Sequence, residues 1–189
     1  IAGALSLGYA SQVIAATEIQ WWHAMGGRNG ELVNQIADGY NKSQSTYKVV
    51  PVFKGNYTET MTAAIAAFRA KKQPHIVQVF EVGTATMMAA KGAIYPVHQL
   101  MTDTNTPFDQ SIYLPAVISY YTTPDNKLLS LPFNSSTPVL WYNADAFKKA
   151  GIASAPTTWD GMMDASKKLV ASGMKCGFSF GWQSWVMIE

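Results

Sequence analysis

The order of apolar segments in the first half of the chain most constrains the fold. Three short apolar runs are each followed by a segment whose apolar residues recur at helical spacing. The runs, which predict strands, are residues 18–22, 47–53 and 75–80. The helices are expected at residues 31–40, from 57 onward and at 83–91. Strand and helix alternation of this kind indicates an α/β fold with a mainly parallel sheet and helices on both faces.

Turn and cap residues mark the ends of these segments. Residues 23–30 are expected to form a Gly-rich loop after the first strand. Asn56 is predicted to cap the second helix, and Glu59, three residues later, completes a reciprocal capping box. Gly92 is expected in the left-handed conformation that ends the third helix.

The second half of the chain predicts a second lobe. Residues 101–128 mix polar and aromatic side chains and are expected to form loops and short helices. Two predicted strands flank a polar segment between Pro132 and Pro138, which is typical of a hinge. The strands are expected at 128–131 and 139–142, helices at 143–150 and 158–169, and a further strand at 176–180. The predicted domain division is lobe I at 17–133, the hinge crossing at 134–138 and an incomplete lobe II at 139–189.

Residues 1–16 have the features of a signal-peptide core and its cleavage site. They carry no charge, are apolar and small, and end in Ala15-Ala16 before the polar Thr17. Without an initiator Met or a basic segment, the chain is expected to begin inside the signal and to be a fragment of a periplasmic protein. The alternative is a buried N-terminal helix. No other segment is long and apolar enough to span a bilayer.

Composition argues against several classes of partner. Only 14% of the residues are charged, the net charge is +2, and the basic residues are scattered, so no nucleic acid partner is expected. His23, His75 and His98 lack metal-ligand spacing, so they are expected to be structural, with no metal site. The single Cys176 either lacks a partner that lies elsewhere or serves as a small buried hydrophobic residue.

Five motifs resemble one known family. They are WHAMGG at 22–27, FKGNY at 53–57, EVGTATMMAAKGAIYPV from 81, LPFNSSTPVLWYNADAFKKAG from 131 and SGMKCGFSFGWQSW from 172. Together they resemble the glycerol-3-phosphate-binding branch of the extracellular solute-binding protein family, which also includes maltose-binding proteins. One departure is Gly161, which stands where that family usually has a carboxylate.

The resemblance implies a fold and a function. The fold is the periplasmic-binding-protein type II clamp, with a mainly parallel sheet in each lobe. The function is capture of sn-glycerol 3-phosphate, or of glycerophosphodiesters, for the membrane permease of an ABC transporter. It implies no catalytic residues and no cofactor, and we expect a monomer.

The resemblance also implies ligand-binding residues. Tyr57, Glu81 and Ser136 are expected to contact the ligand, and Trp182 to line the cleft, with Trp185 nearby. A carboxylate suits the glycerol hydroxyls, whereas the Tyr57 and Ser136 hydroxyls can donate to phosphate oxygens. An Arg for the phosphate and a second Cys to pair with Cys176 are implied in the part of the protein beyond this chain.

Two alternatives compete with this interpretation. The first keeps the clamp and binds an oligosaccharide, because aromatic clefts also suit sugars. The second is an exported α/β-hydrolase, since residues 177–181 fit the G-x-S-x-G nucleophile motif with Ser179 as nucleophile, and residues 23–27 could form an oxyanion loop.

Overall fold

The computed structural model describes residues 15–90 and 92–181. The chain divides into two compact units, which are treated separately below. The first extends to Phe108 and includes Lys127–Leu129, and the second comprises Asp109–Asn126 and the residues from Ser130 onward. The lobe and hinge boundaries expected from the sequence stay a prediction. The predicted signal segment falls almost entirely outside the described residues.

A three-stranded parallel sheet forms the centre of the first unit. Its strands are β1 (Thr17–His23), β2 (Tyr47–Phe53) and β3 (Ile76–Val77). The strand order is β2-β1-β3, and β1 pairs with β2 along its full length, from Thr17 opposite Tyr47 to His23 opposite Phe53. The predicted α/β fold with a parallel sheet is confirmed for this unit.

The predicted third strand at 75–80 is too long. Only Ile76 and Val77 pair with β1, opposite Trp21 and Trp22. The Gln78 amide still donates to the Trp22 carbonyl at 2.9 Å, and the Gln78 side chain accepts a hydrogen bond from the Ala24 amide at 3.1 Å. Residues 78–80 therefore lead into the next helix.

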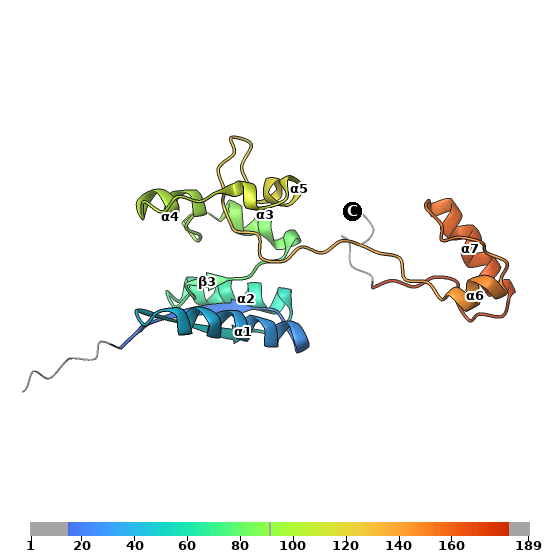
Figure 1. The fold of residues 1–189 in the computed structure, drawn as a ribbon, viewed down its shortest axis with the longest axis horizontal. Coiled ribbons are helices and arrows are strands. Elements are labelled where there is room, and N and C mark those ends of the chain that lie inside the picture. Colours follow the sequence, from blue (N-terminus) through green and yellow to red (C-terminus); the bar gives the residue numbers. More distant parts are fainter. Residues whose placement is uncertain (1–14, 91, 182–189) are drawn as a thin grey trace, which may run out of the picture. The chain divides into compact units, whose positions relative to one another are not determined.

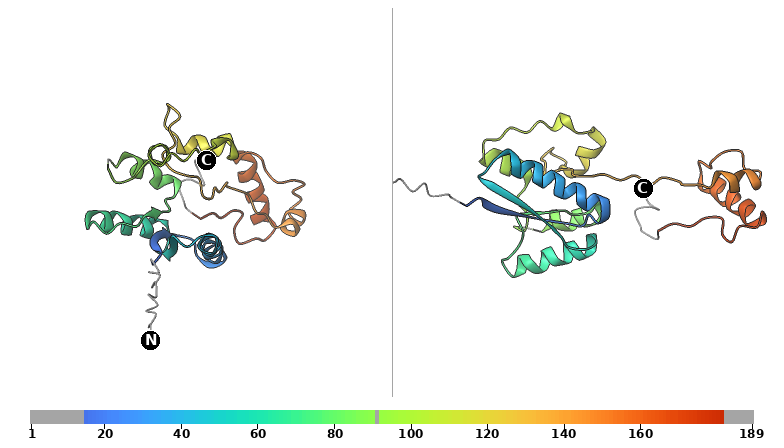
Figure 2. Two further views of the ribbon diagram at one scale, coloured as in Figure 1. Left: turned by 60° about the vertical axis from the view of Figure 1, so that its left-hand side comes forward. Right: turned by 60° about the horizontal axis from the view of Figure 1, so that its bottom comes forward.

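Helices cover both faces of the sheet. Helix α1 (Gly27–Ser43) buries Val33 and Ala37, and α2 (Tyr57–Arg69) buries Thr60 and Ala64. Figure 2 shows α1 and α2 on opposite sides of the strands. The connection from β1 to β2 and the connection from β2 to β3 run in opposite directions along the sheet. Since both are right-handed crossovers, their helices lie on opposite faces.

The first helix begins earlier than the sequence predicts. Residues 27–30 were expected in a loop, yet the Gly30 amide donates to the Gly26 carbonyl at 3.3 Å and closes the first turn. Arg28 and Glu31 form an exposed ion pair across the same turn. The glycines therefore did not prevent helix formation, and the loop after β1 is only residues 24–26.

The second helix starts as predicted. The Asn56 side chain accepts from the Glu59 amide at 2.9 Å, and the Glu59 carboxylate accepts from the Asn56 amide at 2.7 Å. Gly55, just before, takes a positive φ of 89°. This capping box fixes where Tyr57 leaves the loop.

Two further helices complete the first unit. Helix α3 (Glu81–Ala89) begins two residues earlier than expected, and α4 (Val97–Asp103) follows it. Gly92 has φ 74°, as predicted. Backbone hydrogen bonds from Val97 and His98 to the carbonyls of Leu129 and Leu128 hold α4 to the short returning segment.

The second unit contains short helices joined by extended chain. The helices are η1 (Gln110–Ile112), α5 (Pro115–Ile118), η2 (Ser119–Tyr121), α6 (Ala144–Lys149) and α7 (Trp159–Ala171), the longer of which are labelled in Figure 1. Side chains cap the two longer helices, because Asn143 accepts a hydrogen bond from the Ala146 amide and Thr158 accepts one from the Gly161 amide. Gly151 and Gly173 follow the two helices with φ of 69° and 99°.

The strands predicted in the second half are wrong. Residues 128–131, 139–142 and 176–180 form no strand within the described part of the chain. A strand needs a neighbour for its backbone groups, and an apolar run supplies none by itself. Trp141, inside the second run, is 91% exposed. Cys176 is exposed as well, so its interpretation as a buried hydrophobic residue is also wrong.

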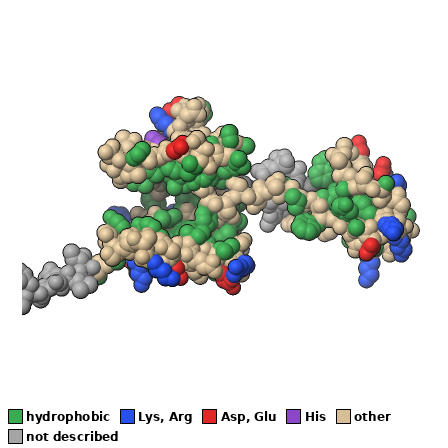
Figure 3. Space-filling model, in the orientation of Figure 1, with side chains coloured by type: hydrophobic (Ala, Val, Ile, Leu, Met, Phe, Trp, Pro, Cys, Tyr) green, Lys and Arg blue, Asp and Glu red, His purple; other side chains and the backbone are tan. Residues whose placement is uncertain are grey.

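Both units leave apolar side chains at the surface. One stripe runs along α1 at Leu32, Ile36 and Tyr40, and another along α7 at Trp159, Met163 and Val170. Figure 3 shows apolar side chains on the surface of the first unit and also over the α6 and α7 region. Helices with an exposed apolar stripe usually contact further protein. Within residues 15–90 and 92–181, no helix combines the length and apolarity required to cross a membrane.

Candidate ligand-binding site

The carboxyl ends of β1, β2 and β3 meet at one edge of the sheet. The pairing places His23 opposite Phe53, and Trp22 opposite Val77. Two backbone hydrogen bonds hold the outgoing loops there, from the Lys54 amide to the His23 carbonyl at 3.0 Å and from the Gln78 amide to the Trp22 carbonyl at 2.9 Å. Ligands of parallel α/β sheets bind beyond this edge.

Tyr57 lies at this edge, at the first position of α2. It is half-buried, and its ring stacks on that of Phe80 with centroids 5.4 Å apart and planes 26° apart. Its hydroxyl has no hydrogen-bond partner among the side chains that the structure describes. A phenol held by its ring with a free hydroxyl can donate to a ligand oxygen.

Glu81 follows at the first position of α3, directly after Phe80. The Tyr57 and Phe80 rings therefore bring the beginnings of α2 and α3 together. Gly83 allows this approach, because a Cβ there would lie 2.7 Å from Met61 Sδ and 3.0 Å from Phe80 Cε1. The backbone of Glu81 is placed at the sheet edge, and the direction of its carboxylate stays a prediction.

The other two predicted ligand contacts stay predictions. Ser136 is exposed in extended chain of the second unit. Trp182, together with Trp185, falls outside the described residues. The structure thus brings Tyr57 close to the backbone of Glu81, and the meeting of this pair with Ser136 and Trp182 stays a prediction.

Three contacts at this edge were not foreseen from the sequence. They are the Phe80 ring under Tyr57, the Gln78 side chain on the loop after β1, and the Lys54 ammonium over the Trp22 ring. A usable signal existed for Phe80, an aromatic residue at the end of a predicted strand just before Glu81. For Gln78 and Lys54 the sequence offered no equivalent signal, because their partners depend on strand order.

His23 closes the carboxyl end of β1 as a buried side chain. Its Nδ1 accepts a hydrogen bond from the Met25 amide at 3.3 Å, and its ring lies 6.0 Å from that of Phe53. Burial lowers its pKa below 6.5. His75 and His98 also form hydrogen bonds with backbone groups, so all three histidines have a structural contact. Within residues 15–90 and 92–181, no group of potential ligands could hold a metal ion.

This burial predicts a dependence of stability on pH. The pKa of His23 is lower in the folded protein than in the unfolded chain, so protons bind the unfolded chain preferentially. We expect the free energy of unfolding of the full-length protein to decrease as pH falls from 6.5 through the lowered pKa. Chemical denaturation at a series of pH values should show a shallower decrease in His23→Gln than in His98→Gln, which keeps His23. Equal slopes in the two variants would contradict the prediction.

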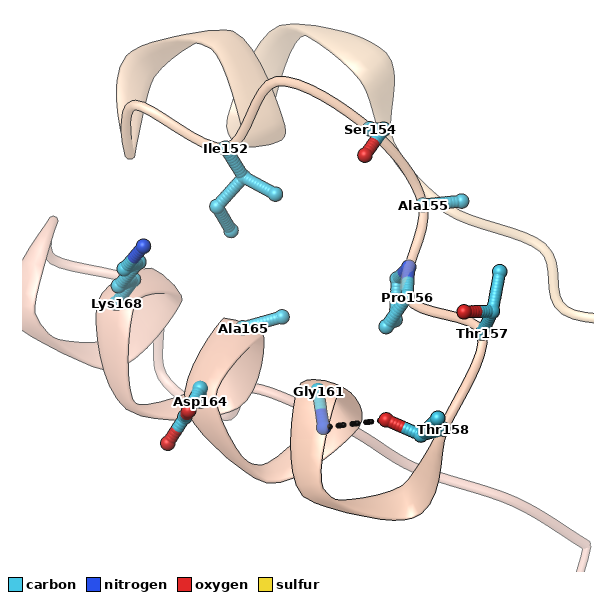
Figure 4. A pocket seen from close by; sticks show the side chains of 10 residues that line it. All are labelled: Ile152, Ser154, Ala155, Pro156, Thr157, Thr158, Gly161, Asp164, Ala165 and Lys168. Atoms are coloured by element: carbon cyan, nitrogen blue, oxygen red, sulfur yellow. Dashed lines mark hydrogen bonds between the residues drawn. The ribbon is translucent and has the colours of Figure 1, made fainter.

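A separate pocket lies in the second unit, between α7 and the loop that precedes it. Its volume is about 330 Å³, and Ile152, Pro156 and Ala165 give it an apolar floor. Figure 4 shows these side chains directed toward the pocket and the bond from Gly161 to Thr158 at its rim. A Cβ at Gly161 would lie 3.3 Å from Pro156 Cβ, so glycine allows the loop to approach the helix. The pocket contains none of the predicted site residues.

Comparison with protein families identifies the chain. The model of the bacterial extracellular solute-binding proteins matches residues 26–189. The chain belongs to this family. The family consists of binding proteins rather than enzymes. In addition, residues 172–180 contain no strand ahead of Ser179, which a nucleophile elbow requires, so the hydrolase alternative is not supported.

Members of this family with a curated name are similar over the whole chain. The chain is 50% identical over 192 residues to the sn-glycerol-3-phosphate-binding periplasmic protein UgpB of Rhizobium meliloti, covering 100% of this chain and 45% of the relative. It is 53% identical over 189 residues to UgpB of Yersinia enterocolitica, covering 98% and 43%. The chain therefore spans less than half the length of these relatives.

Solved structures of solute-binding proteins share the fold. The galacto-N-biose-/lacto-N-biose I-binding protein of Bifidobacterium longum matches with a TM-score of 0.67 and 22% identity, over 84% of this chain and 39% of that one. CpMnBP1 with mannotriose bound matches with a TM-score of 0.63 and 21% identity, over 81% and 38%. These matches establish the predicted fold class, a partial periplasmic-binding-protein α/β fold.

Proposed function

We propose that the full-length protein captures sn-glycerol 3-phosphate for an ABC importer. The observation that carries the proposal is identity of 50% and 53% along essentially the whole chain to proteins named for this ligand. The saccharide-binding neighbours are only 21% and 22% identical, which supports a common fold without a common ligand.

The residues at the sheet edge suit the two halves of this ligand. A carboxylate at Glu81 accepts hydrogen bonds from the glycerol hydroxyls, and such charge-assisted bonds are stronger than neutral ones. The Tyr57 hydroxyl, without a partner among the described side chains, donates to a phosphate oxygen. Ser136 adds a donor from the second unit, and Trp182 covers the ligand and excludes water. We propose these four residues as ligand contacts.

The proposed role also has a location and partners. The relatives carry the word periplasmic in their names, and residues 1–16 have the composition of a signal peptide. We propose export to the periplasm, followed by delivery of the ligand to permease subunits by a monomeric binding protein. No nucleic acid partner is proposed.

A titration tests the ligand against its alternatives. The full-length protein is titrated by calorimetry with sn-glycerol 3-phosphate, with glycerophosphocholine as a phosphodiester, and with maltose. We expect saturable binding of the glycerol phosphate compounds and none of maltose. Saturation by maltose alone would favour the oligosaccharide alternative and contradict the proposal.

Replacing Tyr57 with phenylalanine tests its hydroxyl. The ring that stacks on Phe80 stays, so folding is unaffected, and only the donor is lost. We expect Kd for sn-glycerol 3-phosphate to rise by about tenfold, the effect of one hydrogen bond to a charged group. The matched control is Tyr40→Phe, an exposed tyrosine on α1. Equal affinities in the two variants would remove Tyr57 from the site.

A further inference from the structure

Lys54 is the first residue after β2, at the sheet edge where Tyr57 lies. Its backbone amide is bound to the His23 carbonyl, so the position of the residue is fixed against β1. The capping box at Asn56 fixes the chain two residues later. Lys54 therefore lies in the short ordered loop of residues 54–56, which ends at Tyr57 and is called the Tyr57 loop below.

The Lys54 ammonium is held over the face of Trp22. Nζ lies 3.9 Å from the ring centroid, a cation–π contact. The indole is itself fixed, because it is nearly buried and its Nε1 donates to the Gln20 side chain at 3.2 Å. A long flexible side chain is thus kept in one place at the strand ends.

No carboxylate neutralises this charge among the side chains that the structure describes. Arg28 with Glu31 on α1 and Lys167 with Asp164 on α7 are examples of ion pairs in the described chain, and both are exposed. Lys54, in contrast, is half-buried. An ammonium that rests on an aromatic ring keeps its full positive charge available to an anion that arrives at the same edge.

We propose that Lys54, held on the Trp22 ring in the Tyr57 loop, is a specificity residue that favours ligands with a dianionic phosphate over those with a monoanionic phosphodiester. The proposal rests on the proposed function. It assigns to this half of the protein a positive charge for the phosphate, alongside the hydroxyl of Tyr57. In this proposal Glu81 accepts hydrogen bonds from the glycerol hydroxyls, and Lys54 attracts the negative charge of the phosphate.

The test measures Kd by calorimetry in the full-length protein and in Lys54→Met, with sn-glycerol 3-phosphate and with the phosphodiester glycerophosphoglycerol. We expect Kd for the dianion to rise by about tenfold and Kd for the monoanion by clearly less, as follows from losing one charge-assisted contact. The salt dependence of dianion binding should weaken in the same variant. Lys54→Arg, which keeps the charge and can stack on the ring, should retain most of the preference.

Lys48→Met is the matched control, because Lys48 is exposed toward the other end of β2 and its loss changes the net charge equally. Thermal unfolding of each variant shows whether the fold is intact. An equal loss of affinity for both ligands, or the same effect in Lys48→Met, overturns the role of Lys54 and leaves the proposed function standing. Failure of the unmodified protein to bind either ligand overturns the proposed function, and the role of Lys54 with it.

Discussion

Replacing Gly177 with alanine is expected to destabilise the full-length protein by about 3 kcal/mol, at the upper end of the usual cost of overpacking. A Cβ at this position would lie 2.5 Å from Ser166 Cα and 2.6 Å from Ser166 Cβ, and closer still to the Ser166 carbonyl oxygen. Backbone atoms of a helix cannot rotate away as a side chain can. Ala165 and Leu169 anchor α7 on its buried side, so the segment at Gly177 must move instead.

The measurement is chemical denaturation, with Gly39→Ala as the matched control. Gly39 lies inside α1, and its added Cβ meets no heavy atom within 4 Å. That variant should be as stable as the unmodified protein or more stable by about 0.5–1 kcal/mol, because alanine favours a helix over glycine. Similar stabilities for the two variants would show that the chain does not approach α7 at Gly177.

The same contact gives a structural meaning to the G-x-S-x-G pattern. The first glycine of the pattern is Gly177, and the space at this residue is taken by the backbone of α7. Glycine at this position is required for close packing, without any reference to the chemistry of Ser179. A short motif with a catalytic association thus has a packing explanation in this chain.

Elements set by neighbouring residues could be predicted from the sequence. The capping box at Asn56 depends on side chains that reach only three residues along the chain, and it forms as predicted. The first two strands of the parallel sheet were also predicted, because each apolar run is followed by a helix that returns the chain to the sheet. Glycine at 27 and 30 misled the prediction of α1, since the first turn closes despite them.

Elements that need a distant partner could not be predicted. The apolar run at 139–142 is as suited to a strand as the run at 47–53, yet only the latter has a neighbouring strand in the described structure. The same limit applies to the site. The sequence places Tyr57 and Glu81 after strands, but the Tyr57 stack on Phe80 and the Lys54 contact with Trp22 depend on which strands are adjacent.

Glu81→Gln is expected to have the largest effect on binding, raising Kd for sn-glycerol 3-phosphate by about 30-fold, or about 2 kcal/mol, as for charge-assisted hydrogen bonds. A carboxylate offers two acceptor oxygens to the glycerol hydroxyls, whereas the amide offers one and presents donors in place of the other. Removing the negative charge also lessens repulsion of the phosphate. We expect the loss of the proposed hydrogen bonds to dominate, because the proposed orientation puts the phosphate at the end of the ligand far from Glu81.

A ligand without hydroxyls isolates the role of Glu81. Propyl phosphate keeps the dianion and lacks both glycerol hydroxyls, so calorimetry should show equal or slightly tighter binding of it to Glu81→Gln than to the unmodified protein. Glu31→Gln, an exposed glutamate on α1, is the matched control and should bind both ligands normally. If Glu81→Gln instead bound sn-glycerol 3-phosphate more tightly, the carboxylate would face the phosphate, and the assignment of the hydroxyls to Glu81 would be wrong. The two ligands together therefore determine the orientation of the bound molecule relative to the edge of the sheet.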